Sequence, residues 1–132
     1  MNMKKKILIV EDEYSTIEDI GERLKNDGYE VDVACDVKEA MEHLKESEYA
    51  VVLLDIMLPT REVIERDPEQ AGVEILKNLK KDSPKTRVVV LTAVMNHRTH
   101  KEIKEYAPDE VMIKPVDGNE LCETLKGLVE RG

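Results

Sequence analysis

The stretch Tyr49-Ala-Val-Val-Leu-Leu-Asp55 is apolar throughout and then ends in a carboxylate. Its unbroken apolar run has the length of one strand, and a strand that lacks polar alternation is covered on both faces. A carboxylate at the end of such a strand is costly to leave unpaired. Residues 49–54 therefore predict a central strand, which presents Asp55 at its carboxyl end.

Shorter apolar runs alternate with amphipathic segments on both sides of this strand. Runs at residues 7–10, 29–34, 88–91 and 111–113 predict four further strands. Apolar residues at helical spacing predict helices around residues 17–24, 37–44, 73–79, 97–106 and 121–128. Residues 26–28, Asn-Asp-Gly, predict the end of the first helix. Five strands that alternate with five helices predict an α/β fold, a doubly wound parallel sheet with helices on both faces.

Length and composition favour a single soluble domain over residues 1–132, with an extended irregular loop at about residues 59–71. Apolar residues make up 41% of the chain and charged residues 37%, a balance typical of globular proteins. The net charge of -9 argues against a nucleic-acid surface, which needs a basic face. No apolar run reaches the length of a membrane span. Cys35 and Cys122 lack the paired spacing of a metal or redox site, so we expect two reduced thiols in a cytoplasmic protein.

Polar side chains follow four of the five predicted strands. Ligands of such sheets bind beyond the carboxyl ends of the strands, so we expect these side chains to converge there. Taken singly, each has an ordinary interpretation, such as a helix-capping acid, a turn hydroxyl or a surface cation. Their joint placement favours a site. The residues are Glu11, Asp12 and Glu13 after the first strand, Asp55 after the third, Thr92 after the fourth and Lys114-Pro115 after the fifth.

The chemistry of this set is coherent. Crowded carboxylates repel one another and need a hard cation, and Mg²⁺ takes oxygen ligands. The Asp55 carboxylate can attack phosphorus and form an acyl phosphate. Lys114 offers a positive charge to one phosphoryl oxygen, and the Thr92 hydroxyl can hydrogen-bond another. The sequence therefore predicts a Mg²⁺-dependent phosphoryl acceptor.

Four blocks of the sequence resemble the signature blocks of response-regulator receiver domains. The resemblance implies a flavodoxin-like fold, (βα)5, with the strands in the order 2-1-3-4-5. It also implies a two-component signalling protein, not an enzyme in the ordinary sense. Such a protein takes a phosphoryl group from a histidine kinase or phosphotransfer protein and signals by changing conformation. The blocks are Ile7-Leu-Ile-Val-Glu-Asp-Glu13, Val51-Val-Leu-Leu-Asp-Ile-Met-Leu-Pro59, Val88-Val-Val-Leu-Thr-Ala93 and Ile113-Lys-Pro115.

The resemblance implies a role for each metal-binding residue. Asp12 would coordinate Mg²⁺ directly, and Glu11 would do so through a water molecule. Asp55 would be both phospho-acceptor and metal ligand, and the backbone carbonyl of Met57 would be a further ligand. Glu13 has no family role, and we expect it to be a surface or capping acid.

The resemblance assigns the other site residues to the response that follows phosphorylation. Thr92 would be the switch hydroxyl, Lys114 would pair with the phosphoryl group, and Pro115 would follow in a cis peptide bond. Family members commonly carry an aromatic residue three positions before the lysine, where this chain has Val111. We therefore expect a smaller or differently routed change on the face between the fourth and fifth helices. The same face could form a homodimer, as it does in many receivers.

The segment after the third strand is several residues longer than in the family. Residues 60–70 carry charges of both signs, and we expect Gly72 to take the place of the family's loop glycine. A solvated excursion is the favoured interpretation. The alternative is that Val63 and Ile64 form a lid or a docking element beside Asp55.

Two other functions are weaker alternatives. A phosphorylation-independent binding module, or pseudo-receiver, would keep the fold, but the intact acidic and cationic set argues against it. A phosphohydrolase with an aspartyl nucleophile would carry a second acid two residues after it, where this chain has Met57. His97 and His100 lack a third ligand nearby in the sequence, so we expect exposed polar positions rather than a metal pair. His43 is not expected to donate a phosphoryl group.

Overall fold

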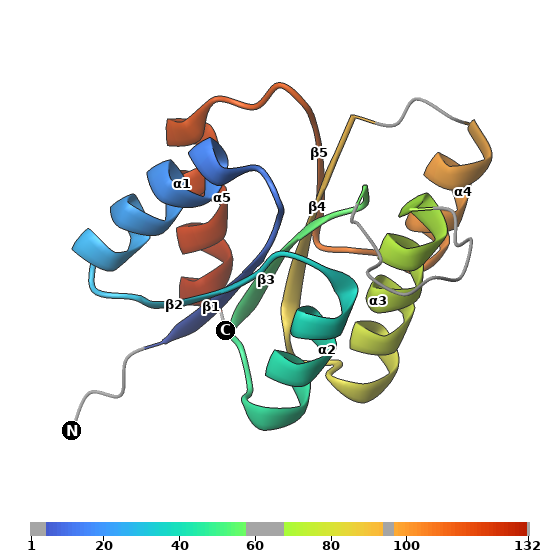
Figure 1. Cartoon of the computed structure of the whole chain (residues 1–132), viewed down its shortest axis with the longest axis horizontal. Helices are drawn as coiled ribbons and strands as arrows, with labels where there is room; N and C mark the ends of the chain where they lie inside the picture. The colour runs from blue at the N-terminus through green and yellow to red at the C-terminus, as the bar shows by residue number, and fades with distance from the viewer. Residues whose placement is uncertain (1–4, 58–67, 94–96, 132) are drawn as a thin grey trace.

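The computed structural model describes residues 5–57, 68–93 and 97–131. Within these residues, strands and helices alternate from one end to the other, as predicted (Figure 1). The strands are β1 (Lys6–Val10), β2 (Glu30–Ala34), β3 (Val51–Asp55), β4 (Arg87–Thr92) and β5 (Glu110–Ile113). The helices are α1 (Tyr14–Asn26), α2 (Val37–Glu46), α3 (Pro68–Asp82), α4 (His97–Glu105) and α5 (Gly118–Arg131).

The described strands form one parallel sheet in the order β2-β1-β3-β4-β5. This order confirms the flavodoxin-like arrangement. The register places Val10 opposite Leu54, and Asp55 opposite Leu91. The carboxyl ends of the central strands are therefore level, and the residues that follow them share one edge of the sheet.

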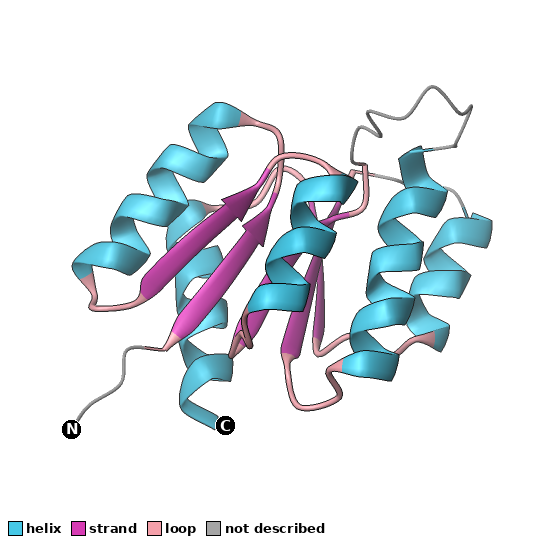
Figure 2. Ribbon diagram, turned by 60° about the horizontal axis from the view of Figure 1, so that its bottom comes forward, coloured by secondary structure: helices cyan, strands magenta, loops and turns pink. Residues whose placement is uncertain are grey.

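Helices cover both faces of the sheet (Figures 1 and 2), and an apolar layer lies on each face. Val52 and Leu54 of β3 face a layer built with residues of α2, α3 and α4. Val51 and Leu53 face a layer built with residues of α1 and α5. Every residue of β3 is buried, which explains why its sequence shows no polar alternation. The prediction of a central strand covered on both faces is confirmed.

The start of α3 corrects one predicted boundary. Residues 68–71 were expected to be irregular, but α3 begins at Pro68. Proline suits the first position of a helix because its missing N–H would have no partner there. Gly72, which we expect to take the place of the family's loop glycine, is within α3. The rest of the extended segment, including Val63 and Ile64, lies outside the described residues.

The first helix ends as the sequence indicates. Gly28 has φ of 96°, a conformation that glycine adopts without steric cost. Its N–H donates to the carbonyl oxygen of Lys25 at 3.0 Å, which closes the last turn of α1. The chain then enters β2.

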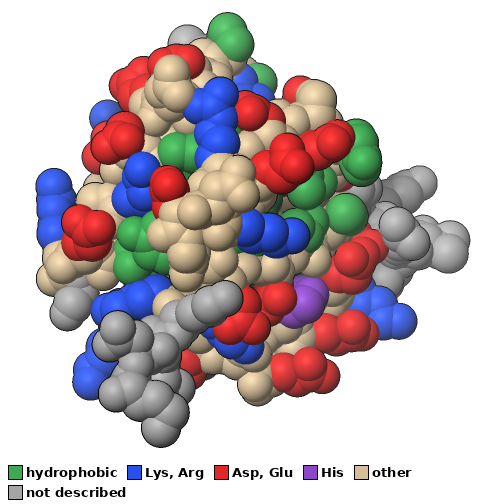
Figure 3. Space-filling view, turned by 90° about the vertical axis from the view of Figure 1, so that its left-hand side faces the viewer, with side chains coloured by type: hydrophobic (Ala, Val, Ile, Leu, Met, Phe, Trp, Pro, Cys, Tyr) green, Lys and Arg blue, Asp and Glu red, His purple; other side chains and the backbone are tan. Residues whose placement is uncertain are grey.

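Figure 3 shows the side of the molecule that carries α1, β2 and α2, on which acidic and basic side chains are intermixed. A surface of this kind differs from the continuous basic face that binds nucleic acid, as the net charge of -9 leads one to expect. Among the described helices, none combines the length and apolar character needed to cross a bilayer.

Candidate functional site

Backbone hydrogen bonds extend the strands past their ends and fix the residues at the carboxyl edge. The N–H of Glu11 donates to the carbonyl of Ala34 at 3.0 Å, which continues the pairing of β1 with β2. The N–H of Lys114 donates to the carbonyl of Thr92 at 2.8 Å. The side chains of Glu11 and Lys114 therefore start from rigid backbone.

Three carboxylates meet at this edge. Glu11, Asp12 and Asp55 each offer one oxygen, and these oxygens lie within 4.8 Å of one another. Glu11 and Asp55 are buried, whereas Asp12 is exposed. A hard divalent cation takes several oxygen ligands and keeps part of its water shell. The donor set fits such an ion, with Asp12 on the solvent side.

Lys114 joins the two buried carboxylates. Its Nζ donates to Asp55 Oδ2 at 3.0 Å and to Glu11 Oε1 at 3.3 Å. Burial lowers the pKa of Lys114, but the hydrogen bond to Asp55 and the charges of Asp55 and Glu11 outweigh this effect and raise it. The lysine is therefore a fixed positive charge. Its hydrogen bonds join residues that are more than fifty positions apart in the sequence.

Glu11 and Asp55 compete for this one cation. Burial and the nearby charge of Asp55 raise the pKa of Glu11 to about 7, although Lys114 acts in the opposite direction. Without a metal ion, part of the protein carries a proton on Glu11 at neutral pH. A divalent cation would have to displace that proton.

This raised pKa predicts how stability depends on pH. Between the ordinary pKa of 4.5 and the folded value of about 7, the folded protein binds more protons than the unfolded chain. The free energy of unfolding contributed by Glu11 therefore falls as pH rises through this window. We expect Glu11→Gln to match the wild type at about pH 5 and to exceed it by about 2 kcal/mol at about pH 8 in chelator.

Urea unfolding of both proteins at the two pH values measures this difference. Glu18→Gln, which changes an exposed glutamate of α1, is the matched control and should show no such pH dependence. A Glu11→Gln difference that does not grow with pH would contradict the raised pKa of Glu11.

The remaining predicted residues lie around the same edge. Thr92 is fully buried at the end of β4. The N–H of Met57 donates to Asp55 Oδ1 at 3.0 Å, so both oxygens of Asp55 accept a hydrogen bond. The Lys114-Pro115 peptide bond is cis, as the resemblance implied.

Glu13 is exposed and stands at the N-cap position of α1, where its side chain makes no capping hydrogen bond. Its N–H donates to Glu11 Oε1 at 3.1 Å. Its side chain accepts a hydrogen bond from Ser15 Oγ at 3.1 Å. The expectation of a surface acid is confirmed, and the backbone of Glu13, not its carboxylate, serves the site.

The histidines and cysteines stay outside the site. His97 is exposed and His100 is half-buried. The acidic triad is the only group of three candidate metal-ligand side chains found among the described residues. His43 lies on α2, and its Nδ1 is 3.3 Å from the hydroxyl of Tyr49. Among the described residues, Cys35 and Cys122 form no disulfide.

Val111 packs against the apolar layer that also contains Ile103 and Tyr106. Tyr106, which follows α4, packs against the same layer. The expected consequence of Val111 for signalling stays a prediction.

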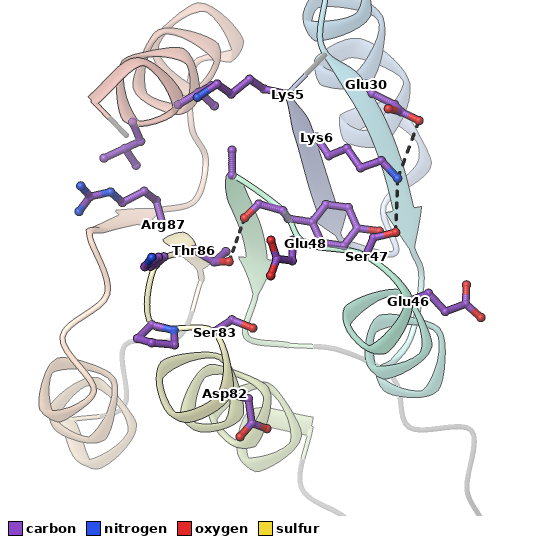
Figure 4. Close-up of a pocket in the computed structure, with 16 residues that line it drawn as sticks. Lys5, Lys6, Glu30, Glu46, Ser47, Glu48, Asp82, Ser83, Thr86 and Arg87 are labelled. Atoms are coloured by element: carbon purple, nitrogen blue, oxygen red, sulfur yellow. Dashed lines mark hydrogen bonds and ion pairs between the residues drawn. The ribbon is translucent and has the colours of Figure 1, made fainter. Parts of the chain in front are cut away.

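The opposite edge of the sheet has a different character (Figure 4). A hollow of about 1150 Å³ lies there, beside the amino ends of the strands. Lys6 hydrogen-bonds Ser47 at 3.3 Å, and Thr86 Oγ1 donates to the carbonyl of Tyr49 at 2.8 Å. Acids and bases are equal in number in its lining, so no charge accumulates there as it does at the carboxyl edge. The charged lining residues are Lys5, Lys6, Lys85, Arg87, Glu30, Glu46, Glu48 and Asp82.

Comparisons with known proteins identify the family. The family model described as response regulator receiver domain matches residues 7–126. The transcriptional regulatory protein DltR of Streptococcus agalactiae is 32% identical over 123 residues, which are 92% of this chain and 50% of DltR. The chain thus spans about half the length of this relative.

Solved structures give the same result. A CheY-like receiver domain protein from Methanospirillum hungatei superposes with a TM-score of 0.83 at 25% identity, over 98% of this chain and 96% of the other. The BeF3-activated receiver domain of DrrB, a Thermotoga maritima protein, has a TM-score of 0.79 at 26% identity, over 98% and 100% of the two chains. The sheet order and the family match agree, and the chain belongs to the response regulator receiver domain family.

Proposed function

We propose that Asp55 accepts a phosphoryl group and that the resulting acyl phosphate switches the conformation of the domain. One observation carries the proposal. Lys114 binds the buried carboxylates of Asp55 and Glu11 together, in a cluster that Asp12 completes on the solvent side. A buried structural ion pair needs one carboxylate for each lysine, whereas a site that also holds a divalent cation needs this surplus of buried acid.

Asp55 would act as the nucleophile. A carboxylate oxygen attacks phosphorus, an O–P bond forms, and the bond from phosphorus to the donor atom breaks. If the donor is a phosphohistidine, the imidazole nitrogen keeps the electron pair of the broken bond and takes up a proton. Lys114 then turns from the carboxylates to the new phosphoryl oxygens, since these carry more charge.

Thr92 would respond to the acyl phosphate. Its hydroxyl lies at the end of β4, the neighbour of β3, and can donate a hydrogen bond to a phosphoryl oxygen. Movement of Thr92 would be transmitted to β5, because Thr92 pairs with Ile113. With Val111 in the aromatic position, we expect the change on the face between α4 and α5 to be small or differently routed.

The residues that would hold Mg²⁺ are Glu11, Asp12 and Asp55, with the backbone carbonyl of Met57. When bound, the ion neutralises charge shared by the acceptor and the phosphoryl oxygens. Glu11 would contribute through a water molecule and Asp12 directly. The exposure of Asp12 and the burial of Glu11 are compatible with these roles.

A histidine kinase or a phosphotransfer protein is the expected donor, since receiver domains are phosphorylated by histidine kinases. The match over residues 7–126 supports one receiver domain within residues 1–132. The intact contacts of Lys114 argue against a pseudo-receiver that works without phosphorylation. A homodimer through the face between α4 and α5 stays a prediction.

The test is incubation with acetyl phosphate, followed by intact-mass measurement. With Mg²⁺ present, we expect one added phosphoryl group per chain. Chelation of Mg²⁺ should reduce the rate of phosphorylation about a hundredfold or more, because the acidic cluster then repels the anionic donor. Equal rates with and without Mg²⁺ would contradict the metal's role, and the absence of any adduct would contradict the proposal.

A further inference from the structure

Gly72 of α3 lies against the backbone of the residue that follows Asp55. A Cβ atom at Gly72 would fall 2.3 Å from the carbonyl oxygen of Ile56, 2.7 Å from its Cα and 2.8 Å from its carbonyl carbon. These are backbone atoms, so no side-chain rotation can relieve the overlap. The helix and the segment after β3 can approach this closely only because residue 72 is glycine.

Two other described helical glycines have open space beside them, and at Gly118, the first residue of α5, the nearest atom to an added Cβ is a side-chain oxygen, Asp19 Oδ2 at 2.8 Å. A Cβ at Gly21 of α1 or at Gly127 of α5 would meet nothing within 4 Å. Alanine at such a site ordinarily favours the helix. Gly72 has no positive φ that would require glycine on conformational grounds. Its close contact with Ile56 is therefore the feature that distinguishes it.

Ile56 is held on several sides. Its N–H donates to the carbonyl of Leu91 at 3.1 Å, and its side chain is fully buried. On one side of it, Asp55 presents the acceptor carboxylate; on the other, the N–H of Met57 donates to Asp55 Oδ1. A shift of the Ile56 peptide would move both neighbours.

The helix is the harder of the two partners to displace. Ala71, Ile75 and Leu76 of α3 are all buried, and Ile75 and Leu76 belong to the same apolar layer as Ile56. Withdrawing the helix would open this layer along its length, which costs packing at every turn. Ile56 lies in the short segment after β3 rather than in a helix, so we expect its peptide to yield before α3 does.

We infer that Gly72 is a positioning residue for the phosphoryl acceptor. Gly72 lets α3 contact the carbonyl group of Ile56. This contact fixes the peptides that orient the Asp55 carboxylate and the Met57 carbonyl. The inference rests on the proposed acceptor function of Asp55, and it adds α3 to the elements that set the geometry of the site.

Gly72→Ala tests the inference, with Gly127→Ala as the matched control. For Gly72→Ala, we expect the rate of phosphorylation by acetyl phosphate, at saturating donor and Mg²⁺, to fall about tenfold or more. Affinity for Mg²⁺, measured without donor, should fall too. Gly127→Ala should stay within about twofold of the wild type in both measurements.

An effect of Gly72→Ala on stability alone must be distinguished from displacement of the Asp55 carboxylate and the Met57 carbonyl. Leu79→Ala removes a buried side chain near the other end of α3, so it destabilises the same helix far from Asp55. At a temperature where all variants are folded, Leu79→Ala should keep the wild-type rate and Mg²⁺ affinity. Equal losses in Leu79→Ala and Gly72→Ala would overturn the inference, as would a Gly72→Ala variant with wild-type values.

Two further readouts keep the outcomes distinct. A wild type that takes up no phosphoryl group defeats the proposed function, whereas the Mg²⁺ affinities of the variants still test Gly72. If Gly72→Ala does not fold, the inference can be tested on the wild type by following its backbone amide resonances by NMR. On Mg²⁺ addition the Gly72 amide should shift and the Gly127 amide should not; an unmoved Gly72 amide would defeat the inference.

Discussion

Asp55→Asn is expected to take up no phosphoryl group from acetyl phosphate, with or without Mg²⁺. An amide oxygen is a far weaker nucleophile than a carboxylate, and it carries no charge to hold a divalent cation. Intact-mass measurement over a time course checks the result. An adduct formed at even about one hundredth of the wild-type rate would require a second acceptor.

The fold should survive this substitution. Asparagine keeps an oxygen that can accept from the N–H of Met57, and Lys114 keeps its contact with Glu11. Loss of the Asp55 charge removes one cause of the raised Glu11 pKa, so stability in chelator should be equal to or above that of the wild type. Asp117→Asn changes an exposed aspartate after β5 and should leave phosphorylation unchanged.

Lys114→Met should have the second largest effect, and it should act on stability and chemistry together. Methionine fills a similar length but leaves the buried carboxylates of Glu11 and Asp55 without a cation. Breaking a buried ion pair by removal of one partner costs about 3–5 kcal/mol. Because the Lys114 side chain is 24% exposed, we expect about 3 kcal/mol at about pH 8 in chelator.

The rate of phosphoryl transfer should fall about a hundredfold in Lys114→Met, because a positive group aimed at the transferred oxygens is lost. Affinity for Mg²⁺ should rise, since Lys114 no longer competes for the oxygens of Asp55. Urea unfolding, Mg²⁺ titration and the acetyl phosphate time course give the three quantities.

Lys126→Met is the matched control. Lys126 also pairs with two carboxylates, Asp27 at 2.9 Å and Glu123 at 3.4 Å. These acids lie at the surface, where ion pairs contribute little. Lys126→Met should leave the rate and the Mg²⁺ affinity unchanged. If Lys114→Met is phosphorylated at the same rate as this control, Lys114 has no role in phosphoryl transfer.

The sequence was sufficient for the sheet and its edge because both follow from local patterns. The unbroken run at residues 51–54 required cover on both faces, and the acid directly after it had to emerge at the carboxyl edge. Glu11 and Lys114 follow strands in the same way, so parallel topology brings them together with Asp55. The comparisons confirm the family inferred from the same blocks of sequence.

The environment of each acid depended on contacts that no local pattern records. Glu11 and Asp12 are neighbours of the same type, yet Glu11 is buried and paired with Lys114, 103 positions away, whereas Asp12 is exposed. The proximity of Gly72 to Ile56 is also a fact of packing, since a glycine in the sequence does not reveal what lies beside it. The start of α3 was different, because Pro68-Glu69 is a helix-start pattern that the sequence contained.

The proposed function requires that Asp55 carries the phosphoryl group. The most direct test is to phosphorylate the wild type with acetyl phosphate and Mg²⁺, reduce the acyl phosphate with borohydride, and map the product by peptide mass spectrometry. We predict that position 55, and no other, is converted from aspartate to homoserine. Conversion at another aspartate or glutamate, with residue 55 intact, would contradict it.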